Sequence, residues 1–277
     1  MLVSGLFRYP VKSCRGHPVS AAEVEPWGLT GDRRWMVVDP AGEVVTARVA
    51  NRLVLITPEI TDRGLHLSAP GVADLVIDRP EAGPKLTVKI WDDWLLARFA
   101  GEIAADWFTE VIGRPLRLVY LDDPRRRPVD PDFGAATDVV SFADGFPLLL
   151  ANQASLDQLN DWIAEGPQSH EGPLPMTRFR PSVVVTGAEP FVEDGWRRVR
   201  IGTVDFRVVK PCARCVLTTV DPTTAARSKE PLVSLARHRK RNGKTLFAMN
   251  LIPDAPYGNL RIGDPVRVLD QTSVEVS

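Results

Sequence analysis

The chain has 277 residues, of which 44% are hydrophobic and 25% charged, which is the composition of a globular protein long enough to bury a core. With 34 Lys and Arg against 35 Asp and Glu, the formal net charge of −1 excludes a general field for nucleic acid or an anionic membrane, so any anion site must be local. Three cysteines and no run of about 18 apolar residues argue against a disulfide framework or a membrane span, and predict a cytoplasmic protein with free thiols.

The first third of the chain is predicted to form short strands joined by tight turns. Residues 34–38 and 43–48 flank Asp39-Pro40-Ala41-Gly42, a sequence typical of a hairpin turn. Further strands are predicted at 53–56, 65–69, 75–77, 86–91 and 116–121. An amphipathic helix is predicted over 102–112, ended by Gly113, because one helical face collects Ala104, Trp107, Phe108 and Val111.

The second half is again predicted to be mostly β. The polar, proline-rich segment 122–131 is interpreted as the connection between halves, and its arginines at 125–127 as a solvated loop. Beyond it we predict helices at 153–164 and 231–238, and strands at 182–186, 199–201, 204–209, 216–220, 246–252 and 265–269. The predicted fold class is mainly β with a few helices (α+β), in two β-rich units, residues 1–122 and 123–277.

Cys212-Ala213-Arg214-Cys215 is the local feature most suggestive of chemistry. A structural zinc ion would need a second pair of soft ligands, which neither Cys14 nor four dispersed histidines supply. A thioredoxin-like dithiol needs a helix after the motif, whereas 216–220 has a strand pattern. Two buried core thiols remain an alternative. Lys210 and Arg214 favour a functional interpretation, because positive charge lowers a thiol pKa toward the thiolate that metals bind.

Two further groups of side chains could bind an anion. Lys12, Ser13 and Arg33 could converge on a phosphate, although each is also an ordinary surface residue. Arg180 directly precedes a predicted buried strand and is either a structural ion-pair partner or a ligand clamp. The sequence has no GxxxxGK[ST] or GxGxxG phosphate loop and no GxSxG elbow, which disfavours nucleotide hydrolysis, NAD binding and serine acyl transfer.

Together these motifs resemble the MOSC proteins, the molybdenum-cofactor sulfurase C-terminal domain group, and within it the two-part branch of the mitochondrial amidoxime-reducing components and their bacterial relatives. The motifs run nearly end to end, at 9–14, 31–35, 45–48, 178–182, 212–222, 228–232 and 262–266. The resemblance implies an N-terminal MOSC β-barrel domain followed by a catalytic MOSC β-barrel domain.

The resemblance also implies a cofactor and an activity. A molybdenum ion would be held by the dithiolene of a phosphorylated pterin, with the Cys215 thiolate as metal ligand and catalytic group. The phosphate and pterin would be bound by Lys12, Ser13, Arg33, Arg180, Ser182, Ala213 through its backbone, Arg214 and Asn250. The implied reaction is reduction of small N-hydroxylated (N-oxygenated) compounds. Because the chain ends at Ser277 without a ferredoxin-type extension, electrons are expected from a separate ferredoxin or flavoprotein.

Two other interpretations stay open. In the first, the protein is a molybdenum-cofactor carrier or sulfur-transfer module in which Cys215 passes on a persulfide sulfur. In the second, it is a β-rich binding protein whose thiols belong only to the core.

Overall fold

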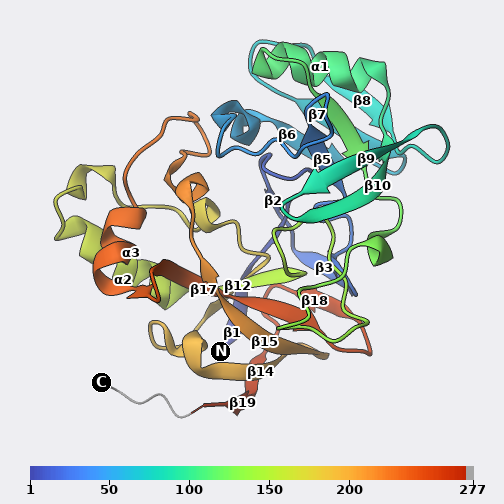
Figure 1. Ribbon diagram of the computed structural model, residues 1–277. Helices are drawn as coiled ribbons and strands as arrows, with labels where there is room; N and C mark the ends of the chain where they lie inside the picture. The colour runs from blue at the N-terminus through green and yellow to red at the C-terminus, as the bar shows by residue number, and fades with distance from the viewer. Residues whose placement is uncertain (273–277) are drawn as a thin grey trace.

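The computed structural model describes residues 1–272, which form a mainly β fold with three α-helices (Figure 1). The predicted fold class is therefore confirmed. The largest sheet has nine strands. In spatial order they are β19 (Val266–Gln271), β14 (Trp196–Ile201), β15 (Val204–Ala213), β17 (Lys244–Pro253), β12 (Leu148–Asn152), β13 (Val183–Thr186), β1 (Leu2–Arg8) and β2 (His17–Pro18), with β16 (Lys240–Arg241) paired to β17.

Three smaller sheets complete the β structure. A four-stranded sheet has the order β5 (Trp35–Val38), β11 (Arg117–Tyr120), β10 (Asp93–Phe99) and β9 (Lys85–Ile90). One three-stranded sheet consists of β6 (Thr57–Ile60), β7 (Gly64–Ser68) and β8 (Leu75–Asp78), and the other of β18 (Asn259–Arg261), β3 (Ala21–Glu25) and β4 (Gly28–Leu29). In Figure 1, β6 to β10 and α1 (Glu102–Ile112) form an upper body above the large sheet.

The two halves of the sequence share strands. β1 pairs antiparallel with β13, with Leu2 opposite Thr186 and Leu6 opposite Val183. β3 pairs in the same way with β18. β1 and β3 thus pair with strands of the C-terminal half of the sequence. The segment between β1 and β2 reaches the other body, because the Lys12 N–H donates to the Trp35 carbonyl and the Arg15 N–H donates to the Ile56 carbonyl. Residues 12–15 therefore lie at the junction of the two bodies.

The helices cover hydrophobic cores as their sequence periodicity requires. The predicted face of α1 is buried, and Gly113 ends this helix in the left-handed conformation, with φ of 83°. Asn152 caps α2 (Gln153–Ala164) by accepting the Ala154 N–H at 3.2 Å. α2 packs beside α3 (Leu232–His238) against the large sheet, over a cluster that contains Phe179 and Phe247. The predicted helices at 102–112, 153–164 and 231–238 are thus confirmed, the last beginning one residue later.

Some predicted strands are wrong. Residues 53–56 fall largely in a 3-10 helix, η1 (Asn51–Leu55), in which the Ile56 N–H donates to the Leu53 carbonyl. The 39–42 turn forms, but after it only Glu43 and Val44 make bridges, so 43–48 is not a continuous strand. The other short 3-10 helices are η2 (Pro124–Arg126), η3 (Ser169–Glu171), η4 (Met176–Phe179), η5 (Val192–Gly195) and η6 (Val216–Thr219). Among residues 1–272, no helix has the length and apolar character needed to cross a membrane.

Candidate functional site

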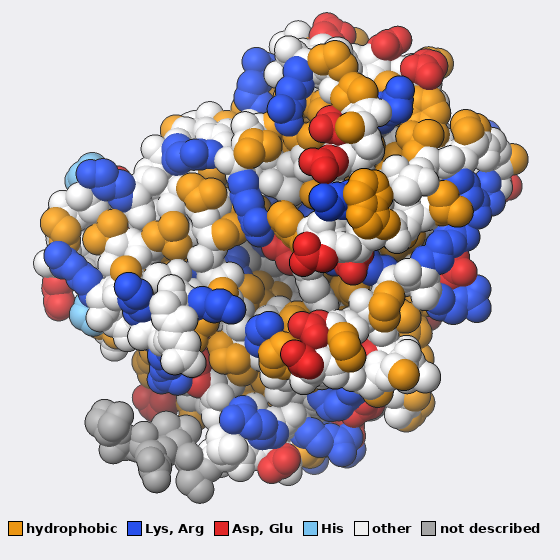
Figure 2. All heavy atoms as spheres, viewed as in Figure 1, with side chains coloured by type: hydrophobic (Ala, Val, Ile, Leu, Met, Phe, Trp, Pro, Cys, Tyr) orange, Lys and Arg blue, Asp and Glu red, His pale blue; other side chains and the backbone are white. Residues whose placement is uncertain are grey.

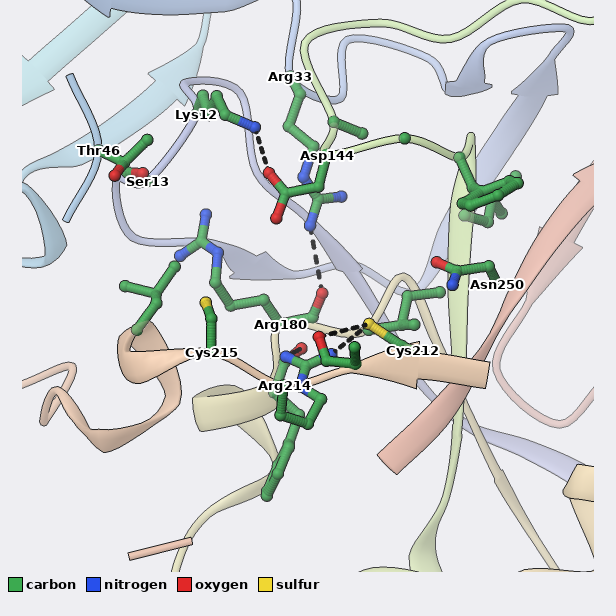
Figure 3. A pocket seen from close by; sticks show the side chains of 18 of the residues that line it. Lys12, Ser13, Arg33, Thr46, Asp144, Arg180, Cys212, Arg214, Cys215 and Asn250 are labelled. Carbon is green, nitrogen blue, oxygen red and sulfur yellow. Dashed lines mark hydrogen bonds and ion pairs between the residues drawn. The ribbon is translucent and has the colours of Figure 1, made fainter. Parts of the chain in front are cut away.

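A cleft that opens to solvent lies where segments of the two halves meet. Figure 2 shows a hollow near the middle of the drawn face, with basic and acidic side chains along its edges. Eight of the nine predicted site residues line the cleft, although they come from distant segments: Lys12, Ser13, Arg33, Arg180, Ala213, Arg214, Cys215 and Asn250. The fold therefore brings these predicted residues together (Figure 3).

Three lining residues hold an unusual backbone conformation. Ser13, Arg33 and Arg180 have φ angles of 68°, 46° and 55°, in the left-handed region that residues with a Cβ seldom adopt. Each such residue costs about 1–3 kcal/mol, and such strain typically collects at functional sites. Arg180 is the residue that ends η4, and the Arg33 N–H donates to the Tyr9 carbonyl at 2.7 Å. The chain thus turns sharply at each of these positions, where a side chain faces the cleft.

The Tyr9 ring supports two of the cleft arginines. The Cζ atoms of Arg33 and Arg180 lie 4.4 and 4.3 Å from the ring centroid, within the range of cation–π attraction. Arg33 also donates to the buried carboxylate of Asp32 at 2.5 Å and to the Arg180 carbonyl at 3.2 Å. Arg180 Nη1 donates to the Cys14 carbonyl at 2.7 Å. Burial raises the pKa of Tyr9 to about 12, so the ring stays neutral at physiological pH.

Lys12 contributes an ammonium group that is only 5% exposed. Its Nζ donates to the Phe142 carbonyl at 2.8 Å and to Asp144 Oδ1 at 2.5 Å. Burial lowers the pKa of Lys12 from 10.5 to about 8, although Asp144 opposes this shift. Partial desolvation raises the pKa of Asp144, but the charge of Lys12 outweighs it and holds that pKa well below its usual value. Both groups are therefore ionised at neutral pH.

Positive charge is concentrated in the cleft of a protein whose net charge is −1. The charged lining residues are five cations and one carboxylate: Lys12, Arg33, Arg48, Arg180, Arg214 and Asp144. Arg180 Nη2 and Arg214 Nε are buried and have no hydrogen-bond partner among the described residues. Buried donors without partners are rare, because each costs free energy. The cleft therefore suits an anionic ligand with several acceptor atoms.

Cys215 stands directly before η6 and is partly exposed, with its thiol facing the cleft (Figure 3). Its carbonyl accepts hydrogen bonds from Thr218 N at 3.0 Å and Thr218 Oγ1 at 2.9 Å. Thr219 Oγ1 bonds the Val216 carbonyl in the same way at 2.8 Å. The strand predicted at 216–220 is therefore wrong, because threonine hydroxyls satisfy the carbonyls of a helical turn there. The argument from that strand against a dithiol also fails, but Figure 3 shows Cys212 and Cys215 in different parts of the cleft.

The other two cysteines have raised pKa values. Burial raises the pKa of Cys14 to about 12. Burial also raises the pKa of Cys212, although Arg214 Nη1 lies 2.8 Å from its sulfur. The expectation that Lys210 and Arg214 lower a thiol pKa is therefore wrong for Cys212. Burial outweighs Arg214 there, and Lys210 Nζ lies 3.9 Å from the centroid of the Phe133 ring.

Of the predicted residues Asn250 and Ser182, only Asn250 lines the cleft. Asn250, in β17, lines the cleft and donates from Nδ2 to the Lys210 carbonyl at 3.1 Å, which orients its amide. Ser182 does not line the cleft: it is fully buried, and its Oγ accepts the Leu149 N–H at 3.3 Å. Ser182 thus holds the backbone of a lining residue rather than facing the cavity itself.

The sequence did not single out Asp144 or Arg48 as site residues. Asp144 lies in 141–147, Ser-Phe-Ala-Asp-Gly-Phe-Pro, where a lone carboxylate in a Gly- and Pro-containing segment precedes the apolar strand β12. A carboxylate in such a segment indicates a loop at the end of a strand, where functional residues often lie. Arg48 lies in the 45–48 motif that carried the resemblance, and Asp144 reaches it at 3.4 Å.

Comparisons with known proteins identify the family of this chain. The MOSC N-terminal beta barrel domain matches residues 1–115, and the MOSC domain matches residues 137–267. Mitochondrial amidoxime-reducing component 1 from Homo sapiens is 37% identical, over 97% of this chain and 83% of its own length. The chain belongs to this family of two-domain MOSC proteins. Mitochondrial amidoxime reducing component 2 from Homo sapiens is 35% identical, over 95% of this chain and 82% of its own length.

The family assignment confirms the predicted resemblance. The relative named mitochondrial amidoxime-reducing component 1 in Xenopus laevis is 33% identical, over 96% of this chain and 81% of its own length. Among solved structures, the YUAD protein from Bacillus subtilis superposes with a TM-score of 0.40 at 9% identity, over 96% of this chain and 93% of that one. A structural likeness this weak adds nothing to the family assignment.

Proposed function

We propose that this protein is a molybdenum-cofactor-dependent oxidoreductase that reduces N-hydroxylated (N-oxygenated) compounds, with the Cys215 thiolate as a metal ligand. The observation that carries the proposal is a partly exposed thiol in a cleft lined by five cations and one carboxylate. The names of the relatives support the substrate class, because an amidoxime is an N-hydroxylated compound. A cytoplasmic setting and a separate electron donor of ferredoxin or flavoprotein type belong to the same proposal.

The side chains of the cleft suit a metal ion whose other ligands come from its cofactor rather than from the protein. Within residues 1–272, no group of three or more His, Cys, Asp or Glu side chains could hold a metal ion. Cys215 is thus suited to add one sulfur to a metal already bound by a pterin dithiolene, and thiolates suit such sulfur-binding metals. The bound cofactor would supply the redox chemistry that removes oxygen from the substrate, and the chain would supply binding and orientation.

The lining residues divide into two proposed groups. Lys12, Ser13 and Arg33 would bind the phosphate, because they offer an ammonium, a hydroxyl and a planar guanidinium as donors. Arg180 and Arg214 carry the unpartnered buried donors and would offset the negative charge of the sulfur ligands. The remaining contacts would come from the Ala213 backbone and the Asn250 amide.

The direct test is to produce the chain in a host that makes the molybdenum cofactor. Molybdenum content, pterin fluorescence and reduction of an amidoxime with a chemically reduced dye would then be measured. We expect molybdenum and pterin in equal amounts, together with turnover of the amidoxime to the amidine. Protein with neither molybdenum nor pterin would contradict the proposal. Cofactor that passes to an apo-enzyme faster than any N-hydroxy compound is reduced would instead support the carrier alternative.

The pH dependence of anion binding provides an independent prediction. Because burial lowers the pKa of Lys12 to about 8, its ammonium charge is present below pH 8 and is lost above it. The guanidinium charges around Lys12 do not change in this range, because arginine is always protonated in proteins. Asp144, whose pKa the charge of Lys12 holds well below its usual value, stays ionised. We therefore expect sulfate, whose own charge is constant in this range, to bind more weakly as the pH rises, by about tenfold in total between pH 7 and 9.

Isothermal titration of cofactor-free protein with sulfate at pH 7 and 9 measures this effect. Lys12→Arg is the matched control, because a guanidinium keeps its charge at pH 9 and should remove most of the decline. Equal sulfate affinity of the parent protein at both pH values would show that Lys12 does not bind the anion.

A further inference from the structure

Arg127 is a buried arginine that is not among the residues lining the cleft. Its side chain is 3% exposed, and its Nε donates to Asp93 Oδ2 at 2.8 Å. Its other nitrogens hold three main-chain carbonyls of one loop: Nη1 donates to those of Ser141 at 2.7 Å and Ala143 at 2.5 Å, and Nη2 donates to that of Asp144 at 3.0 Å. The interpretation of 125–127 as a solvated loop is therefore wrong for Arg127.

The loop that Arg127 holds, residues 141–144, also contacts the cleft cations. The carbonyl that Arg127 does not bind, that of Phe142, accepts from Lys12 Nζ at 2.8 Å. The Phe142 N–H donates to the Arg33 carbonyl at 2.9 Å. The Asp144 carboxylate pairs with Lys12 at 2.5 Å and with Arg48 at 3.4 Å. The loop is thus fixed on one side by Arg127 and on the other by the proposed phosphate site.

We propose that Arg127 is a positioning residue that fixes loop 141–144 and, through this loop, the arrangement of Lys12, Arg33 and Asp144 in the cleft. A guanidinium is suited to this role, because its planar fork of donors can bind several carbonyls at once. Without it, the carbonyls at 141, 143 and 144 lose their arginine donors in a mostly buried loop. The consequence for cofactor binding rests on the function proposed above, whereas the fixing of the loop does not.

A purely structural role would centre on the ion pair with Asp93. The Asp93 side chain is 44% exposed, so this pair is partly screened by water and contributes little. If Arg127 served only to tie β10 to the connecting segment, Asp93→Asn would reproduce the effects of removing the arginine. If Arg127 acts through the loop carbonyls, Asp93→Asn leaves the loop in place.

The test compares four variants with the parent protein: Arg127→Met, Arg127→Lys, Asp93→Asn and Arg125→Met. Arg125→Met is the matched control, because Arg125 lies in the same segment, is 77% exposed and pairs with Asp123 at 2.8 Å. Hydrogen–deuterium exchange of the peptide 139–147 reports on the loop and requires no cofactor. Molybdenum and pterin per folded protein report on the cleft, and thermal unfolding reports on overall stability.

We expect the Phe142 amide to exchange at least about tenfold faster in Arg127→Met and to an intermediate extent in Arg127→Lys. Exchange in Asp93→Asn and Arg125→Met should match the parent protein. Molybdenum and pterin content should fall in Arg127→Met, and less in Arg127→Lys. If Arg127→Met does not fold, the same comparison is made with Arg127→Lys.

Parental exchange at 139–147 in the Arg127 variants would overturn the positioning role. Faster exchange with parental molybdenum and pterin content would overturn the link from the loop to the cleft. A parent protein that contains neither molybdenum nor pterin would contradict the proposed function instead. In that case the exchange data alone still decide whether Arg127 fixes the loop.

Discussion

Replacing Cys215 with alanine is expected to abolish reduction of N-hydroxylated compounds while leaving the fold intact. The side chain is partly exposed and stands before a helical turn that is held by its backbone carbonyl, so truncation removes little packing. In the proposed function its thiolate binds the metal directly. Changes to groups that only support metal ligands typically cost about 10–100-fold in affinity or activity, so removal of the ligand itself should cost more. Amidoxime reduction and molybdenum content per folded protein measure the effect.

Cys212→Ala is the matched control for this variant. Cys212 lies two residues beyond Lys210 in β15 and its sulfur contacts Arg214 at 2.8 Å, with no direct role assigned to it. We expect Cys212→Ala to retain molybdenum and most of the activity. Full activity in Cys215→Ala, or equal losses in both variants, would show that Cys215 has no special role.

Replacing Arg180 with methionine is expected to remove most of the bound cofactor. Arg180 brings a cation with an unpartnered Nη2 into the cleft, held over the Tyr9 ring and by the Cys14 carbonyl. Loss of one member of a buried, hydrogen-bonded charge pair costs about 2–5 kcal/mol, which corresponds to at least roughly thirtyfold weaker binding. The free energy of unfolding should fall by only about 1–2 kcal/mol, because one hydrogen bond to the Cys14 carbonyl and one cation–π contact with Tyr9 are lost.

Pterin retained after gel filtration measures this loss, and chemical denaturation measures the change in stability. Arg180→Lys should retain an intermediate amount, because it keeps the charge but not the planar donor fork. Arg237→Met, which removes an exposed arginine on α3, is the control and should retain all of the cofactor. Full retention of pterin in Arg180→Met would exclude Arg180 from the binding site.

The parts of the fold that local sequence specifies were predictable. The 102–112 and 153–164 helices follow from a repeated apolar face, and Gly113 supplies the expected left-handed end. β12, by contrast, was not predicted. Its residues, Leu148 to Asn152, are almost all apolar and show no alternation, because the strand lies inside a sheet whose neighbours come from distant segments. β1 was missed for a related reason, since its partner β13 begins about 180 residues later.

The site residues that could be predicted from the sequence are those whose side chains are chemically distinctive. Cations and thiols can be found in a sequence, and the family resemblance assigns Lys12, Arg33, Arg180 and Cys215 to one site. The local sequence could not show that Arg127 is buried, because its partners are carbonyls of 141–144, which any residue carries. Nor could it show that Ser182 does not line the cavity, because its burial depends on a contact with Leu149 from a distant segment.

X-ray absorption at the molybdenum edge tests the central claim most directly. The measurement compares the loaded parent protein with Cys215→Ser, which keeps a side chain of similar size but replaces sulfur by oxygen. If the Cys215 thiolate binds the metal, the variant should lose one sulfur neighbour from the molybdenum shell, and any metal it retains should gain an oxygen neighbour. An identical sulfur shell in the parent protein and the variant would show that Cys215 is not a ligand, and would contradict the proposed function in its present form.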